Sequence, residues 1–190
     1  MKIAVLLSGT GRTLDNFHEW IEAGALNASI QVVISNVAFS LGLEKAENYG
    51  YPAFHAEDNE AINTILQDYD VELICLAGYL KLYEPPEYLE RSVLNVHPSL
   101  IPSFCGPGFY GMRVHQSVKD RGVRVSGCTV HFANDVYDEG PIVVQKCVQV
   151  ESDDSPGDIA DKVFAAECEA FPEAINLVDE KGVNSFWSAN

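Results

Sequence analysis

Two polar side chains, Asn95 and His97, lie two residues apart in segment 92–102, which reads Ser-Val-Leu-Asn-Val-His-Pro-Ser-Leu-Ile-Pro. Because side chains alternate along a strand, Asn95 and His97 should share one face. Pro98 should end this strand, which places the pair at its carboxyl end, where open α/β sheets bind ligands. Two hydrogen-bonding groups on a buried strand require polar partners. The partner is either a ligand or, in the alternative interpretation, another part of the protein.

An acidic loop further along the chain offers a carboxylate to His97. Segment 126–141 predicts a strand followed by a loop with several acidic residues. A carboxylate facing His97 would raise the pKa of the imidazole and keep it protonated near neutral pH, as acid–base chemistry requires. The spacing does not choose among Asp135, Asp138 and Glu139. A solvated acidic turn without a catalytic role is the alternative.

The first predicted strand runs into a glycine-bearing turn, residues 8–14, which reads Ser-Gly-Thr-Gly-Arg-Thr-Leu and precedes a helical pattern. Such a turn presents free N–H groups and the positive end of the helix dipole, which together bind anions. Leu14 occupies the third glycine position of the dinucleotide fingerprint, and no Gly-Lys-Ser/Thr of a P-loop is present. Arg12 could hold a phosphate bidentately, so a single phosphate is favoured over a dinucleotide. A tight turn without ligand is the alternative.

Alternating strand and helix patterns must position these residues. The predicted strands are 2–7, 29–35, 52–55, 71–76, 92–97, 124–132 and 141–149. The predicted helices are 12–23, 41–49, 57–69, 85–91, 111–121 and 156–180. Near-continuous apolar runs such as Ile3–Leu7 indicate a mainly parallel, twisted sheet with helices on both faces. We therefore expect one α/β domain over residues 1–182 and a C-terminal tail over 183–190.

The composition excludes several classes of partner. The 190 residues include 12 Lys and Arg against 28 Asp and Glu, a formal net charge of −16. This balance disfavours nucleic acid and anionic membranes, which both require basic surfaces. The apolar run at the N-terminus is too short for a signal peptide, and no segment approaches the ~18 apolar residues of a membrane span. The five cysteines lack a C-x-x-C motif, and we expect reduced thiols in a cytoplasmic protein.

Four motifs in order resemble the glycinamide ribonucleotide formyltransferases, folate-dependent enzymes of purine synthesis. They are Ser8-Gly9-x-Gly11, Ala77-Gly78-Tyr79-Leu80, Asn95-Val96-His97-Pro98-Ser99-Leu100-Ile101-Pro102 and segment 126–141. The resemblance runs from residue 1 to about residue 180. It implies a single-domain, Rossmann-like fold. It also implies direct transfer of a formyl group from 10-formyltetrahydrofolate to the amine of 5-phosphoribosylglycinamide, without a metal or a protein nucleophile.

The same resemblance implies a role for individual residues. The catalytic group is Asn95, His97 and Asp138, in which Asn95 and protonated His97 bind the oxyanion and Asp138 keeps His97 protonated. The substrate phosphate is assigned to Gly11, Arg12 and Thr13, and the glycinamide to Glu167. The folate is assigned to Leu80, Lys81, Leu82, Tyr83, Asn95, Asn134, Val136 and Tyr137. His115, Thr129 and His131 are candidates for supporting positions.

The position of Glu167 also stands out in the sequence itself. Ile159, Val163, Glu167 and Ala170 fall on one helical stripe, so Glu167 interrupts an otherwise apolar face. An ordinary surface charge is the alternative. Phe164, one turn earlier, replaces a polar residue that some members of the family carry.

Three other activities compete with formyl transfer to the ribonucleotide. A hydrolase could use the same three residues to release formate from formyltetrahydrofolate. A formyltransferase acting on another amine is the second alternative, and a non-catalytic phosphate-binding module is the third. In each case the expected partners are small molecules, and the chain is expected to be a monomer or a homodimer.

Overall fold

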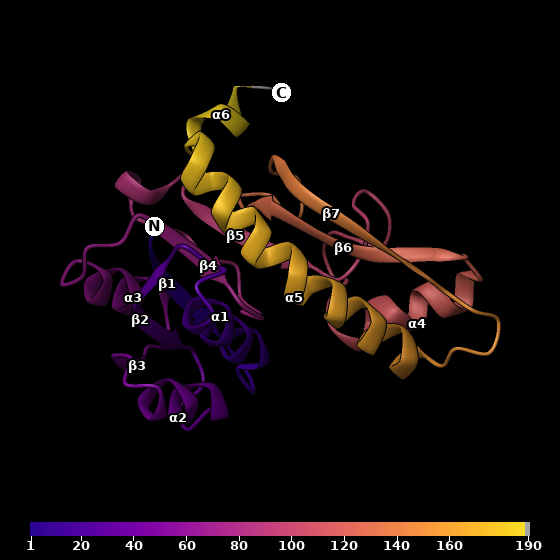
Figure 1. Cartoon of the computed structure of the whole chain (residues 1–190), viewed down its shortest axis with the longest axis horizontal. Helices are drawn as coiled ribbons and strands as arrows, with labels where there is room; N and C mark the ends of the chain where they lie inside the picture. Colours follow the sequence, from indigo (N-terminus) through magenta and orange to yellow (C-terminus); the bar gives the residue numbers. More distant parts are fainter. Residues whose placement is uncertain (189–190) are drawn as a thin grey trace.

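The computed structural model describes residues 1–188 and contains one seven-stranded sheet with the order β3-β2-β1-β4-β5-β6-β7 (Figure 1). The strands are β1 (Lys2–Leu7), β2 (Ser29–Ser35), β3 (Ala53–His55), β4 (Leu73–Leu76), β5 (Val93–His97), β6 (Val125–Phe132) and β7 (Ile142–Gln149). The helices are α1 (Arg12–Glu22), α2 (Leu41–Asn48), α3 (Asn59–Leu66), the 3₁₀ turn η1 (Glu87–Leu89), α4 (Met112–Arg121), α5 (Pro156–Lys181) and α6 (Asn184–Trp187).

The sheet is parallel over its first five strands in space and antiparallel at one edge. β3, β2, β1, β4 and β5 pair in parallel, whereas β6 pairs antiparallel with both β5 and β7. The expected α/β fold with a mainly parallel sheet is therefore confirmed. β6 and β7 follow each other through one loop with no crossover helix, as antiparallel neighbours can, whereas α4 lies between β5 and β6 in the chain.

Strand β1 shows why both faces of the sheet need helices. Ile3, Val5 and Leu7 belong to the core that contains α1 and α5, whereas Ala4 and Leu6 belong to a second core on the opposite face. This second core includes buried residues of α3. Alternation along the strand buries each face, which explains the near-continuous apolar run.

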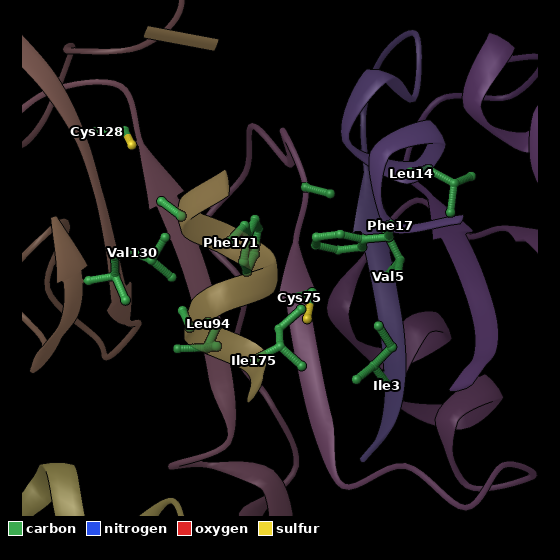
Figure 2. Close-up of a cluster of buried hydrophobic side chains, with 14 of the residues drawn as sticks. Ile3, Val5, Leu14, Phe17, Cys75, Leu94, Cys128, Val130, Phe171 and Ile175 are labelled. Carbon is green, nitrogen blue, oxygen red and sulfur yellow. The ribbon is translucent and has the colours of Figure 1, made fainter. Parts of the chain in front are cut away.

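Helix α5 forms much of the larger core as it runs along the sheet (Figure 1). Figure 2 shows Phe171 of α5 between Leu94 of β5 and Phe17 of α1. The rings of Phe17 and Phe171 make an edge-to-face pair, with centroids 5.0 Å apart and planes at 78°. This packing fixes α5 relative to α1, which matters because each helix carries a residue of the candidate site.

The predicted helix over 85–91 is wrong, because only the single turn η1 forms there. Pro86 is extended, with φ −64° and ψ 153°, and Pro85 is itself followed by a proline, which disfavours helical backbone. Within the expected tail over 183–190, Asn184–Trp187 form the short helix α6, in which the indole of Trp187 donates to the Arg91 carbonyl at 3.1 Å; residues 189–190 lie outside the described residues. Trp187 also packs on Phe132.

The strand order creates a switch point between β1 and β4, since β2 lies on the other side of β1. The carboxyl ends of β1, β4 and β5 therefore open at one edge of the sheet, where α/β proteins bind ligands. All five cysteines are free. Within residues 1–188, no helix combines the length and apolar character needed to cross a membrane.

Candidate active site

A cleft of about 750 Å³ lies at this edge of the sheet. Its walls come from the turn after β1, the segment after β4, the end of β5, the loop between β6 and β7, and α5. The predicted site residues that line it are Gly11, Arg12, Thr13, Leu80, Lys81, Leu82, Tyr83, Asn95, His97, Asn134, Val136, Tyr137, Asp138 and Glu167. The structure thus brings every residue predicted for the site into one cleft.

Strand β5 presents Asn95 and His97 on the same side, as the alternation of side chains requires. His97 is buried, and its Nδ1 atom lies 3.5 Å from Oδ1 of Asp138. On the other side of the ring, Nε2 lies 2.9 Å from the carbonyl oxygen of Phe104. Because a carbonyl only accepts, Nε2 carries a hydrogen and donates it.

Asp138 is the acidic residue that faces His97, and geometry alone selects it. Its side chain is 8% exposed, whereas Asp135 and Glu139 point to solvent. Asp138 adopts a left-handed backbone conformation with φ 61°, which aspartate tolerates better than most residues. Its Oδ2 atom accepts a hydrogen bond from the backbone N–H of Gly106 at 2.7 Å.

His131 holds the side-chain amide of Asn95. Nδ1 of His131 donates to the carbonyl of Phe132 at 2.9 Å, so in the neutral imidazole Nε2 is the acceptor. Nδ2 of Asn95 lies 3.1 Å from this Nε2 atom and donates to it when the ring is neutral, whereas a protonated ring attracts Oδ1 of Asp138, 3.7 Å from the same nitrogen. The amide nitrogen of Asn95 has two hydrogens, and this contact uses one of them. The other remains for a ligand.

Asp138 raises the pKa of His97 as expected, but the net direction is opposite to the expected one. Burial lowers the pKa of His97 below its ordinary value, and this outweighs Asp138 and the Phe104 carbonyl, which both raise it. Burial also tends to raise the pKa of Asp138, but contacts with His131, the Gly106 N–H and His97 hold it below its usual range. The sequence showed the carboxylate but not how deeply the imidazole is buried.

The turn after β1 forms an open helix N-terminus at the other end of the cleft. Gly11 caps α1 with φ 72°, and no side chain satisfies the first N–H groups of the helix. A Cβ atom on Gly11 would lie 2.8 Å from the Cα atom of Gly42, so glycine is required here on two grounds. Arg12 is exposed in the cleft, and its Cζ atom lies 3.6 Å from the ring centroid of Phe164.

Glu167 faces the cleft from the buried stripe of α5. Its neighbours on the stripe, Ile159, Val163 and Ala170, are fully buried, while Glu167 is partly exposed. Desolvation raises the pKa of Glu167 to about 7, with Arg12 opposing the rise. Glu167 can therefore carry or release a proton near neutral pH.

Residues 1–175 match the family model described as formyl transferase. The chain belongs to the formyl transferase family.

Individual relatives of the chain agree with the family match. The chain is 34% identical over 191 residues to the phosphoribosylglycinamide formyltransferase of Haemophilus influenzae, covering 94% of the chain and 87% of the relative. It is 39% identical over 189 residues to the chicken trifunctional purine biosynthetic protein adenosine-3, covering 94% of the chain. The crystal structure of glycinamide ribonucleotide transformylase 1 from Symbiobacterium toebii superposes with a TM-score of 0.86 at 36% identity, covering 95% and 88% of the two chains.

Several curated relatives are longer than this chain. The chain spans 18% of the chicken trifunctional protein. It spans 66% of the chloroplastic phosphoribosylglycinamide formyltransferase of Arabidopsis thaliana, to which it is 33% identical.

The segment after β4 gives the cleft a partly apolar wall. Leu80 and Leu82 are exposed at the cleft, whereas Tyr83 is buried and its hydroxyl donates to Oδ1 of Asn63 at 2.8 Å. The ammonium of Lys81 donates to the carbonyl of Glu57 at 2.8 Å. Tyr83 therefore supports the wall, and Leu80 and Leu82 supply its exposed apolar surface.

The loop between β6 and β7 forms the opposite apolar edge. Val136 and Tyr137 are exposed large side chains that line the cleft. The Oδ1 atom of Asn134 accepts from the N–H of Val136 at 3.0 Å, which shapes the loop. The side chain of Asn134 thus stabilises the backbone on which Val136 and Tyr137 are mounted.

Sequence reasoning missed the carbonyl of Phe104, because no side-chain pattern signals a backbone contact. His115 is buried, lines the cleft and has an Nδ1 atom without a partner among the described residues. Thr129, in contrast, donates to the Ser99 carbonyl at 2.7 Å and accepts from the Ile101 N–H at 3.0 Å. Thr129 therefore anchors the loop that follows His97.

Proposed function

We propose that this protein transfers a formyl group from 10-formyltetrahydrofolate to the amine of 5-phosphoribosylglycinamide. The observation that carries the proposal is the meeting of Asn95, His97 and Asp138 in one cleft with the uncapped, Arg12-bearing start of α1. Asn95, His97 and Asp138 suit a reaction at a carbonyl group. The start of α1 suits the phosphate of the formyl acceptor. Relatives named as phosphoribosylglycinamide formyltransferases support this assignment.

In the proposed reaction, the neutral amine of the acceptor attacks the formyl carbon. A new C–N bond forms, and the electron pair of the carbonyl moves to its oxygen. The free hydrogen of the Asn95 amide donates to this oxyanion, a type of stabilisation that contributes about 3–4 kcal/mol per donor. Because Nε2 of His97 already donates to the Phe104 carbonyl, His97 donates to the oxyanion through Nδ1 once the ring is protonated. The oxyanion then collapses, the bond from carbon to N10 breaks, and the proton lost by the attacking amine ends on N10.

The charge of His97 changes along this path. In the free protein, burial keeps the pKa of His97 below its ordinary value. An oxyanion beside the ring adds a second negative charge to that of Asp138, so the pKa of His97 rises as the intermediate forms. Nδ1 of His97 then takes up the proton that the attacking amine loses, and the ring stabilises the oxyanion as an imidazolium whose charge Asp138, 3.5 Å away, balances. The same proton passes to N10 when the intermediate collapses.

The two substrates occupy different parts of the cleft. The phosphate of the acceptor lies at Gly11, Arg12 and Thr13, and Glu167 interacts with its glycinamide end. The folate lies between the two apolar edges, the one after β4 and the one that carries Val136 and Tyr137. A cleft of about 750 Å³ is of the size that such ligands require.

The remaining assignments follow the same proposal. We assign the activity to residues 1–182, and residues 183–190 to a C-terminal extension. The protein acts on these small molecules in the cytoplasm as a monomer or homodimer, without a nucleic acid, a membrane or a metal as partner.

An acceptor-dependence assay tests the proposed function. Purified protein is mixed with 10-formyltetrahydrofolate, with and without 5-phosphoribosylglycinamide, and both tetrahydrofolate and free formate are measured. We expect tetrahydrofolate to form only with the acceptor, in equal amount to the formylated ribonucleotide. Equal formate release with and without acceptor would instead identify a formyltetrahydrofolate hydrolase. Turnover with another amine alone would identify a formyltransferase of different specificity.

A further inference from the structure

An arginine and an aromatic ring from distant parts of the chain meet at the phosphate end of the cleft. Arg12 begins α1, and Phe164 lies in the third turn of α5. The Cζ atom of Arg12 lies 3.6 Å from the centroid of the Phe164 ring, close enough for face-to-face stacking of the guanidinium. Both residues line the cleft, and Phe164 precedes Glu167 by about one helical turn.

Stacking leaves the hydrogen-bonding capacity of Arg12 intact. All five N–H donors of a guanidinium lie in its plane, so a ring against its face occupies none of them. Across the part of the chain that the structure describes, no ion pair includes Arg12. A polar residue in place of Phe164 could accept from the edge of the guanidinium and compete with an anion. The phenylalanine ring restricts the Arg12 side chain but accepts no hydrogen bond from the edge of its guanidinium, so it does not compete with an anion.

A comparison within the molecule shows how close this contact is. Arg113 lies 4.8 Å from the ring of Tyr110, and Arg91 lies 5.7 Å from the ring of Trp187. Arg12 makes the shortest of these three contacts, although it is exposed and could otherwise adopt many rotamers. Holding one rotamer before the ligand arrives removes part of the entropy cost of binding.

We propose that Phe164 is a positioning residue, which holds the Arg12 guanidinium over the start of α1 so that its N–H edge binds the phosphate of the acceptor. This inference rests on the proposed function for the identity of the acceptor. It adds that recognition of the phosphate depends on α5 as well as on the turn after β1. The pair then selects phosphorylated ligands over their unphosphorylated counterparts.

A double-mutant cycle tests the pair, with Arg12→Ala, Phe164→Leu, their combination, and the conservative variant Phe164→Tyr. We expect Phe164→Leu to raise the KM for the ribonucleotide about 3- to 10-fold, with kcat and the KM for 10-formyltetrahydrofolate nearly unchanged. Arg12→Ala should raise the same KM further. In the Arg12→Ala background, Phe164→Leu should have no additional effect, and Phe164→Tyr should retain the normal KM.

Arg91→Ala is the matched control, since it removes an equal charge and a stacked arginine outside the cleft. It should leave the KM for the ribonucleotide unchanged. Independent, multiplying effects of Arg12→Ala and Phe164→Leu would overturn the inference, because they would show that the residues act separately. A fall in kcat for Phe164→Leu with unchanged KM would overturn it as well, because it would indicate a general structural role.

Calorimetric titration with ribose 5-phosphate separates this inference from the proposed function, because it needs no turnover. If the wild type binds this probe and Phe164→Leu weakens binding only when Arg12 is present, the pair recognises phosphate whatever the acceptor. If the wild type formylates the ribonucleotide but all four variants match it in KM and probe affinity, the pairing fails while the proposed function stands.

Discussion

The Nδ1 atom of His97 lies 3.5 Å from Oδ1 of Asp138, at a distance where the carboxylate acts on the charge of the ring without a short hydrogen bond. Burial nevertheless dominates and lowers the pKa of His97. Asp138 therefore reduces the amount by which burial lowers the pKa of His97. When the ring gains a proton, the carboxylate also balances its positive charge. This relationship leads to a direct test by titration.

Asp138→Asn should lower the pKa of His97 further, because it removes the negative charge that raises it. It should also lower kcat by roughly 100-fold or more, since the imidazolium would lose its counter-charge in the transition state. NMR titration of the histidine rings measures the first effect, and steady-state kinetics measures the second.

Asp135→Asn is the matched control for this substitution, because Asp135 lies on the same loop but points to solvent. It should leave both the His97 titration and kcat unchanged. An unaltered or raised pKa of His97 in Asp138→Asn would contradict the proposed electrostatic role.

Asn95→Ala should lower kcat by roughly 10²- to 10³-fold, as loss of one oxyanion donor does in other enzymes. The KM for the ribonucleotide should change little, since the amide acts mainly in the transition state. Asn48→Ala, at the exposed end of α2, is the control and should behave as the wild type. A large rise in KM with normal kcat for Asn95→Ala would show that the amide only binds the ground state.

The sequence predicts most of the fold because local patterns and tertiary packing agree. The run Ile3–Leu7 is apolar on both faces, and the structure buries both faces of β1. Agreement fails at 85–91, where Pro85-Pro86 suited the start of a helix. Pro86 is instead extended, and only one 3₁₀ turn forms after it.

The candidate site could be predicted only in part. Periodicity placed Asn95 and His97 on one face, but spacing did not choose among three acidic residues of the loop. The choice of Asp138 depends on its left-handed backbone and on the Gly106 N–H, which belongs to a different loop. The lowered pKa of His97 depends on burial by surrounding elements, which a single segment does not reveal.

Gly11→Ala should destabilise the protein more than Gly24→Ala, although both glycines have a similar positive φ, 72° and 69°. Each substitution places a side chain in left-handed backbone, at a cost of roughly 1–2 kcal/mol. Only at Gly11 would the new Cβ atom also lie 2.8 Å from the Cα atom of Gly42, whereas Gly24 has open space. Urea unfolding monitored by circular dichroism gives both free energies of unfolding.

Gly11→Ala should also disturb the phosphate end of the cleft. We expect Gly11→Ala to raise the KM for the ribonucleotide, because the first turn of α1 must shift to relieve the contact with Gly42. Gly24→Ala should leave this KM unchanged. Equal loss of stability in the two variants would show that α1 and α2 separate without cost.

Glu167→Gln should stabilise the protein increasingly as the pH rises. The pKa of Glu167 is about 7 in the folded protein, against 4.5 as its ordinary value, because folding desolvates the carboxyl group. Between these values the unfolded chain releases the proton and the folded protein keeps it, so stability falls as pH increases through this window. The loss is at most about 3 kcal/mol, and less where water screens the partly exposed carboxylate. Glutamine cannot ionise, and therefore avoids this loss.

Thermal unfolding at pH 4.5 and pH 8 measures this effect as the difference in Tm between Glu167→Gln and the wild type. The difference should be small at pH 4.5, where the carboxyl group is protonated in the folded protein, and clearly larger at pH 8. Glu180→Gln, at an exposed position of the same helix, should change Tm equally at both pH values. A Glu167→Gln difference that shrinks between pH 4.5 and pH 8 would mean that the ionised carboxylate stabilises the fold, with the attraction of Arg12 exceeding the cost of burial.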